Sequence, residues 1–123
     1  MIINKEPDFL RQLCEELASR HNYQLEKVPY AGDPDLLVKN PASGKAVAIE
    51  LKDAGAYGEL PISTILPISK LAKQTDKFAK VILITFSNVP ALLSQKLAEL
   101  NVEAITRPTV KQAAEKVQLA LSA

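Results

Sequence analysis

The chain has 123 residues, of which 47% are hydrophobic and 24% are charged, and its formal net charge is +1. These values indicate one globular domain spanning residues 1–123, without the global basicity that would by itself indicate a nucleic-acid partner. The single cysteine, Cys14, excludes a disulfide framework and a cysteine-based zinc cage. Because no apolar run approaches the roughly 18 residues of a membrane helix and no secretory signal opens the chain, we expect a cytoplasmic protein.

The first half of the chain predicts a helix followed by three strands. Over residues 7–21, apolar side chains recur at helical spacing on one face, and Pro7 suits the first turn. The alternating segment "YQLEKV" predicts a strand over residues 23–28, and "YAGDP" predicts a turn after it. Two further strands, "DLLVK" and "AVAIELK", are predicted over residues 35–39 and 46–52, separated by the loop "NPASGK".

The second half of the chain predicts alternating helices and strands. Gly55, Gly58, Pro61 and Pro67 predict a loop before the next helix. The continuous β-branched run "KVILITF" is typical of a central strand covered on both faces. The predicted elements are a helix over 68–78, a strand over 80–86, a helix over 89–100, a strand over 102–105 and a helix over 107–123. The order α-β-β-β-α-β-α-β-α indicates an α/β domain around a mixed sheet, antiparallel at first and parallel afterwards.

The strand "AVAIELK" ends with an acid and a base on the same face. Side chains alternate across a strand. One face would therefore carry Val47, Ile49 and Leu51, and the other Ala46, Ala48, Glu50 and Lys52. Two small residues followed by two charged ones leave space beside the charges, which favours a functional site at the end of this strand.

The hairpin spacing predicts that Asp35 lies opposite Glu50. This register follows if Lys39 pairs with Ala46 across the loop. Two carboxylates about 5 Å apart repel by roughly 3 kcal/mol at an effective dielectric near 20, so a cation is needed to compensate. Mg²⁺ takes oxygen ligands and is a natural candidate, and Lys52 would reach a water or phosphate held there. A shifted register would make the Asp35 position diagonal, and a plain surface ion pair between Glu50 and Lys52 is the alternative interpretation.

These residues resemble a known superfamily. Pro34-Asp35, followed across a hairpin by Glu50-Leu51-Lys52 and preceded by a helix, resembles the PD-(D/E)xK nucleases with the restriction-endonuclease-like fold. The core order of that family, α-β-β-β-α-β, matches the order predicted here over residues 7–86. The segment "KVILITFSNVPALLSQKLAELNVEAI" is similar to the second half of Holliday-junction-resolvase-like and Mrr-like members. The implied fold is an αβββαβ core, with a mixed sheet flanked by helices and a C-terminal α-β-α extension.

The resemblance implies metal-dependent hydrolysis of DNA phosphodiester bonds. Asp35 and Glu50 would bind a catalytic Mg²⁺, with Mn²⁺ as a substitute, helped by the Leu51 carbonyl. Lys52 would orient or deprotonate the water that attacks in line with the leaving group, and would stabilise charge on the phosphate. Asp33 is an alternative to Asp35 as a ligand.

Many members of the superfamily also place a glutamate from the first helix at the metal. In this chain the position of that residue is open. Glu16 borders the apolar stripe, next to Leu13 and Leu17, and is the first candidate. Asp8 and Glu15 are the alternatives. Each of these acids would otherwise be an ordinary solvated charge on the helix.

A row of lysines follows the predicted site. Four residues recur at helical spacing and would line one helical face: Lys70, Lys73, Lys77 and Lys80. Such a row would contact DNA phosphates without regard to sequence, and Gln74 beside it is a candidate contact near the site. An ordinary solvated helix face is the alternative.

The predicted function is a small Mg²⁺-dependent DNA endonuclease. Because one small subunit offers a single site for two DNA strands, we expect a homodimer. The alternative function is a catalytically inactive nuclease-like module that binds DNA or another protein.

Overall fold

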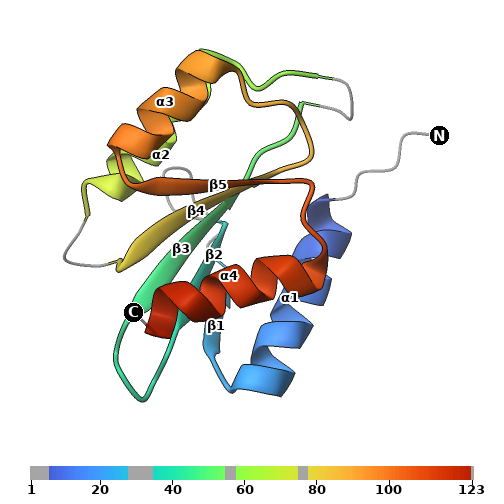
Figure 1. Cartoon of the computed structure of the whole chain (residues 1–123). Coiled ribbons are helices and arrows are strands. Elements are labelled where there is room, and N and C mark those ends of the chain that lie inside the picture. The colour runs from blue at the N-terminus through green and yellow to red at the C-terminus, as the bar shows by residue number, and fades with distance from the viewer. Residues whose placement is uncertain (1–5, 28–34, 55–57, 75–77, 123) are drawn as a thin grey trace.

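The computed structural model describes residues 6–27, 35–54, 58–74 and 78–122, and Figure 1 shows the whole chain. Its elements are, in chain order, α1 (Glu6–His21), β1 (Gln24–Lys27), β2 (Leu36–Lys39), β3 (Ala46–Leu51), the 3-10 helix η1 (Ile62–Thr64), α2 (Ile65–Ala72), β4 (Lys80–Thr85), α3 (Ala91–Glu99), β5 (Val102–Thr106) and α4 (Val110–Ser122). This confirms the predicted order of helices and strands. The predicted turn at residues 30–34 lies outside the described residues. Within the described ranges, no helix is long and apolar enough to cross a membrane.

The described strands form one five-stranded sheet in the order β1-β2-β3-β4-β5. The pairs β1–β2 and β2–β3 are antiparallel, whereas β3–β4 and β4–β5 are parallel. Parallel strands need a crossover, and the segments that contain α2 and α3 supply the two crossovers here. The predicted mixed sheet, antiparallel at first and parallel afterwards, is therefore confirmed.

Helices cover both faces of the sheet. α1 and α4 pack on one face, where the core includes Leu13, Leu17, Val47, Ile49, Ile82, Ile84, Ala114 and Val117. α2 and α3 pack on the other face, where the core includes Ala48, Ile68, Leu71, Leu83, Leu93 and Leu97. In Figure 1 the two helix pairs lie on either side of the sheet. Because neighbouring side chains of a strand alternate, Glu50 points, like Ala48, to the α2–α3 face.

The predicted helix over residues 68–78 is wrong at both ends. The 3-10 helix starts at Ile62, and α2 itself ends at Ala72. Pro67 does not interrupt this helix because it is its third residue, where a backbone N–H would have no helical partner to lose. At the other end, the chain leaves the helix before Phe78, which packs against the α2–α3 core just ahead of β4.

The predicted row of four lysines on one helical face is wrong as a consequence. Lys70 lies in the last turn of α2, Lys73 directly follows the helix, and Lys80 opens β4. Lys77 lies outside the described residues. What the structure retains of the row is an exposed pair, Lys70 and Lys73, at one end of α2.

Two adjacent leucines on α3 test the described core. Leu93 is fully buried in the α2–α3 core, whereas Leu92 is 57% exposed. Replacing Leu93 by alanine should lower the free energy of unfolding by about 2–5 kcal/mol, because it removes apolar burial and leaves a cavity. Leu92→Ala should change it by less than about 0.5 kcal/mol. Urea unfolding of both variants measures the difference, and equal losses would contradict the placement of α3.

Candidate active site

The β2–β3 hairpin has the register that the sequence predicts. Lys39 pairs with Ala46, and the pairing continues to Leu36 opposite Ile49. Asp35 directly precedes β2, so one further step brings it opposite Glu50. Because both residues lie one position beyond a paired position, both side chains belong to the α2–α3 face of the sheet.

Direct contacts tie Asp35, Glu50 and Lys52 together. The backbone N–H of Asp35 donates to Glu50 Oε1 at 3.1 Å. The Nζ of Lys52 lies 3.7 Å from Glu50 Oε2, an ion-pair distance. In return, the N–H of Leu51 donates to Asp35 Oδ2 at 2.7 Å. The structure therefore brings both acids and the lysine to one place, at the end of β3.

Burial differs sharply within this group. Glu50 is 4% exposed, although it carries a carboxylate. The side chain of Lys52 is 42% exposed, so its ammonium is open to solvent and to any ligand that arrives from there. Asp35 is half-buried, between these two extremes. A ligand would therefore meet the lysine at the surface and the carboxylates deeper in.

The electrostatics of Glu50 follow from this burial. The pKa of its carboxyl is raised from 4.5 to about 7, first because burial disfavours the charged form and second because the Asp35 carboxylate is close. The Lys52 ammonium and the hydrogen bond from the Asp35 N–H oppose the rise without cancelling it. A carboxyl in this state has too little positive charge around it, and a divalent cation would supply what is missing.

The residues present fit a hard divalent cation. In an extended strand, the N–H and C=O of one residue point to the same side. The N–H of Lys52 faces β4, where it donates to the Ile84 carbonyl at 3.1 Å. The backbone of Leu51 therefore faces the other way, toward Asp35, as its N–H bond to that carboxylate shows. Two carboxylates and the Leu51 carbonyl make an all-oxygen set, which suits Mg²⁺ when waters complete the coordination.

A third acidic ligand is not found in this set. Within residues 6–27, 35–54, 58–74 and 78–122, no three His, Cys, Asp or Glu side chains gather where they could hold a metal. Asp33, the alternative to Asp35, lies outside the described residues.

The structure does not bring Glu16 to the other predicted site residues. It lies on α1, which covers the sheet face opposite to the one that carries Glu50. There Glu16 lines a hollow of about 600 Å³ between α1 and α4. Its carboxylate forms an ion pair with Arg20 at 3.1 Å. The sheet thus separates Glu16 from the acids at the end of β3.

The two alternatives to Glu16 also form ion pairs on α1 itself. Asp8 and Glu15 are exposed on α1, and both pair with Arg11, at 3.6 and 3.1 Å respectively. Asp8 is the nearer of the two to the end of β4, because its neighbour Phe9 stacks edge-on against Phe86 at 5.2 Å between ring centroids.

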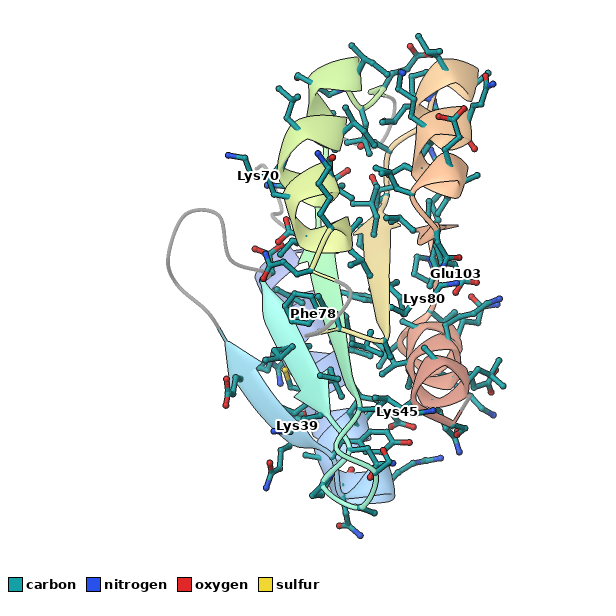
Figure 2. All side chains as sticks on the ribbon, turned by 90° about the vertical axis from the view of Figure 1, so that its left-hand side faces the viewer. Lys39, Lys45, Lys70, Phe78, Lys80 and Glu103 are labelled. Carbon is teal, nitrogen blue, oxygen red and sulfur yellow. The ribbon has the colours of Figure 1, made fainter. Side chains whose placement is uncertain are left out.

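Three of the predicted DNA contacts, Lys70, Lys73 and Gln74, belong to α2 or the residues just after it, on the same sheet face as Glu50. Figure 2 shows Lys70 pointing away from α2 into solvent. Gln74 follows the helix, and its amide Nε2 donates to the Lys70 carbonyl at 3.4 Å. Lys70 and Lys73 are exposed cations on the element that covers the Glu50 face.

The sequence analysis missed a polar network that anchors the segment after Lys52. Ser87 is fully buried, and its hydroxyl donates to the Asp53 carboxylate. The same hydroxyl accepts from the Ala54 N–H at 2.6 Å, and the Ser87 N–H donates to Thr85 Oγ1 at 3.0 Å. A Cβ at Gly58 would overlap the Ala54 carbonyl, so glycine is required at this position. The signal that could have found the network is the polar segment "TFSN" at the carboxyl end of a buried parallel strand.

Comparison with known proteins identifies the fold. No protein-family model matches the chain, and no curated protein matches its sequence. Among solved structures, the restriction endonuclease FokI bound to DNA is similar, with a TM-score of 0.63 and 15% sequence identity over 96% of this chain and 26% of FokI. The fold is restriction-endonuclease-like.

A second structure, AF1548, a protein of unknown function, aligns with a TM-score of 0.58 and 13% identity. The alignment covers 88% of this chain and 65% of AF1548. This chain therefore spans less than two thirds of either protein. At such identities the likeness shows the fold alone.

The raised pKa of Glu50 makes the stability of the metal-free protein depend on pH. The folded state holds the Glu50 proton more tightly than the unfolded state, so the free energy of unfolding falls as pH rises from 4.5 to about 7 and is level above. The loss should be about 3 kcal/mol. Glu50→Gln has no carboxyl at this position and lacks this pH dependence. Between pH 4.5 and pH 8 its free energy of unfolding should therefore rise relative to that of the wild type by about 3 kcal/mol.

Urea unfolding in EDTA at several pH values measures this difference. Glu26→Gln, at an exposed position on β1, is the matched control and should follow the wild type. If the free energies of unfolding of Glu50→Gln and of the wild type change with pH in parallel, the described environment of Glu50 is contradicted.

Proposed function

We propose that this protein is a metal-dependent endonuclease that hydrolyses DNA phosphodiester bonds by in-line attack of water. The observation that carries the proposal is the meeting of Asp35, Glu50 and Lys52 at the end of β3, with a buried, protonatable carboxyl at its centre. The restriction-endonuclease-like fold supports it. In the proposal, Asp35, Glu50 and the Leu51 carbonyl hold Mg²⁺, with Mn²⁺ as a substitute.

Each residue of the site has a distinct part in the proposed reaction. When bound, the metal ion would act as a Lewis acid toward the phosphate and would favour hydroxide formation. The Asp35 carboxylate is held in place by the Leu51 N–H, and the Glu50 carboxylate by the Asp35 N–H. In the proposal, the exposed Lys52 ammonium would donate hydrogen bonds to the attacking water and to a phosphate oxygen, where negative charge increases.

DNA is the proposed substrate, as it is the partner in the FokI structure. The overall charge of +1 gives little general attraction, so binding would depend on local cations. Lys70 and Lys73 are proposed to contact phosphates, because both are exposed on the α2 side of the sheet where Glu50 lies. A homodimer, which would bring two sites to two strands, and a cytoplasmic location are part of the same proposal.

Cleavage assays test the proposal directly. With plasmid, linear duplex and branched DNA, the wild type should cleave in Mg²⁺ or Mn²⁺ and not in EDTA. Lys52→Ala should lower the rate by about 10²–10⁴-fold, since it removes the group that orients and stabilises the reacting atoms. Glu50→Ala should lower it by at least about 10²-fold and should also weaken Mg²⁺ binding.

Two controls keep the assay specific. Lys39→Ala removes a positive charge, as Lys52→Ala does, and Glu26→Gln removes a negative charge, as Glu50→Ala does. Both control positions are exposed, on β2 and β1, and both variants should retain full activity. Metal-independent DNA binding without cleavage, unchanged in Glu50→Ala and Lys52→Ala, would contradict the nuclease and would favour the inactive DNA-binding module instead.

A further inference from the structure

Arg107, which directly follows β5, has an unusual backbone conformation. Among the described residues, three that are not glycine have a positive φ: Asn22, Asn101 and Arg107. Asn22 and Asn101 follow the ends of α1 and α3, where asparagine commonly adopts this conformation. Arg107 has φ 50° with a long side chain that gives no such local compensation. Backbone strain of this kind persists where the surrounding structure holds it, and it is concentrated at functional sites.

Two contacts hold Arg107 toward the neighbouring strand. Its N–H donates to the Thr85 carbonyl at the end of β4, at 2.8 Å. Its guanidinium Nη2 donates to Asn88 Oδ1 at 3.1 Å. Both contacts therefore direct Arg107 toward β4, which lies between β5 and β3, the strand that carries Glu50 and directly precedes Lys52.

Asn88 is itself tied to the segment that follows the candidate site. The N–H of Asn88 donates to the Gly58 carbonyl at 2.9 Å, and the Leu60 N–H donates to the Asn88 carbonyl at 2.9 Å. Asn88 thus connects residues 58–60 with the arginine that follows β5. Both Asn88 and Arg107 are exposed, so a ligand at the strand ends can reach them.

The sheet register sets the distance between Arg107 and the site. Leu51 pairs with Ile84, and Ile84 with Ile105, so Lys52 and Thr106 lie in the same row across the sheet. Arg107 is the first residue after β5, and β5 lies two strands away from β3, about 10 Å to the side. Each DNA strand carries a phosphate about every 3.4 Å along the helix axis, so this offset corresponds to a phosphate within about three nucleotides.

We propose that Arg107, positioned by Asn88, binds a phosphate of the DNA strand within about three nucleotides of the phosphate that is cleaved. The planar guanidinium presents paired N–H donors that match phosphate oxygens. A contact at this distance would fix the direction and register of the DNA strand across the carboxyl ends of β3, β4 and β5. This inference rests on the proposed function, because it names a subsite for the same substrate.

The strained backbone allows a variant that separates binding from folding. Glycine and asparagine both adopt a positive φ more readily than arginine. Arg107→Gly and Arg107→Asn should therefore keep the melting temperature of the wild type or raise it. In EDTA, where cleavage is absent, their affinity for duplex DNA should fall about tenfold, because a charged hydrogen bond to phosphate is lost. The negative slope of log K for association against log salt should decrease in magnitude by about 1.

Lys45→Gln is the matched control, since it also removes one positive charge. Figure 2 shows Lys45 in the β2–β3 hairpin, at the other end of the molecule from α2 and α3. Lys45 is exposed, and the Lys45→Gln variant should have the same DNA affinity and the same salt slope as the wild type.

The outcomes separate this inference from the proposed nuclease activity. An unchanged salt slope in Arg107→Gly, or an equal loss in Lys45→Gln, overturns the subsite and leaves the nuclease proposal standing if the wild type cleaves. A reduced slope together with an inactive wild type supports the subsite and overturns the nuclease. A melting temperature that falls in both Arg107 variants assigns the residue to folding and overturns the subsite. No binding of DNA by the wild type overturns both.

Discussion

The buried carboxyl of Glu50 is the constraint on which the candidate site depends. Its burial and the nearness of Asp35 both disfavour its charge, and the single ammonium of Lys52 at 3.7 Å does not compensate for them. The stability lost at neutral pH has to be offset elsewhere, and the fully buried leucine and isoleucine side chains on both faces of the sheet provide that stability. A protein that needed only packing at this position would be better served by an apolar residue, as buried polar groups are costly unless they have a function or full compensation.

One strand explains why so many polar groups meet at one edge of the sheet. β3 is antiparallel to β2 and parallel to β4, so its carboxyl end lies beside the start of β2 and beside the ends of β4 and β5. Asp35 arrives from the antiparallel half, and Asn88 and Arg107 arrive from the parallel half. The change from antiparallel to parallel pairing at β3 thus assembles residues that are far apart in the chain.

The sequence predicts the parts of this arrangement that depend on counting along neighbouring strands. The six-residue loop between β2 and β3 was enough to place Asp35 opposite Glu50, because period-two alternation and a hairpin leave little freedom. Glu16 was misplaced because helical periodicity shows which face of α1 is buried but not which face of the sheet α1 covers. The start of α2 was misjudged because Pro67 was taken for a loop residue. Arg107 gave no signal, since its backbone conformation depends on contacts with β4.

Two unfavourable features of the described structure lie at the same edge of the sheet. One is a carboxyl whose pKa is raised to about 7, and the other is an arginine with a positive φ. In the two cores and at the ends of α1 and α3, local preference and tertiary structure agree: buried β-branched strands, apolar helix faces and asparagines at helix ends. Disagreement between local preference and structure is expected where function imposes its own requirement. A cation would stabilise the Glu50 carboxylate, and the exposed guanidinium of Arg107 is suited to phosphate oxygens, so the proposed site is complementary to a metal ion bound together with a phosphate-bearing strand.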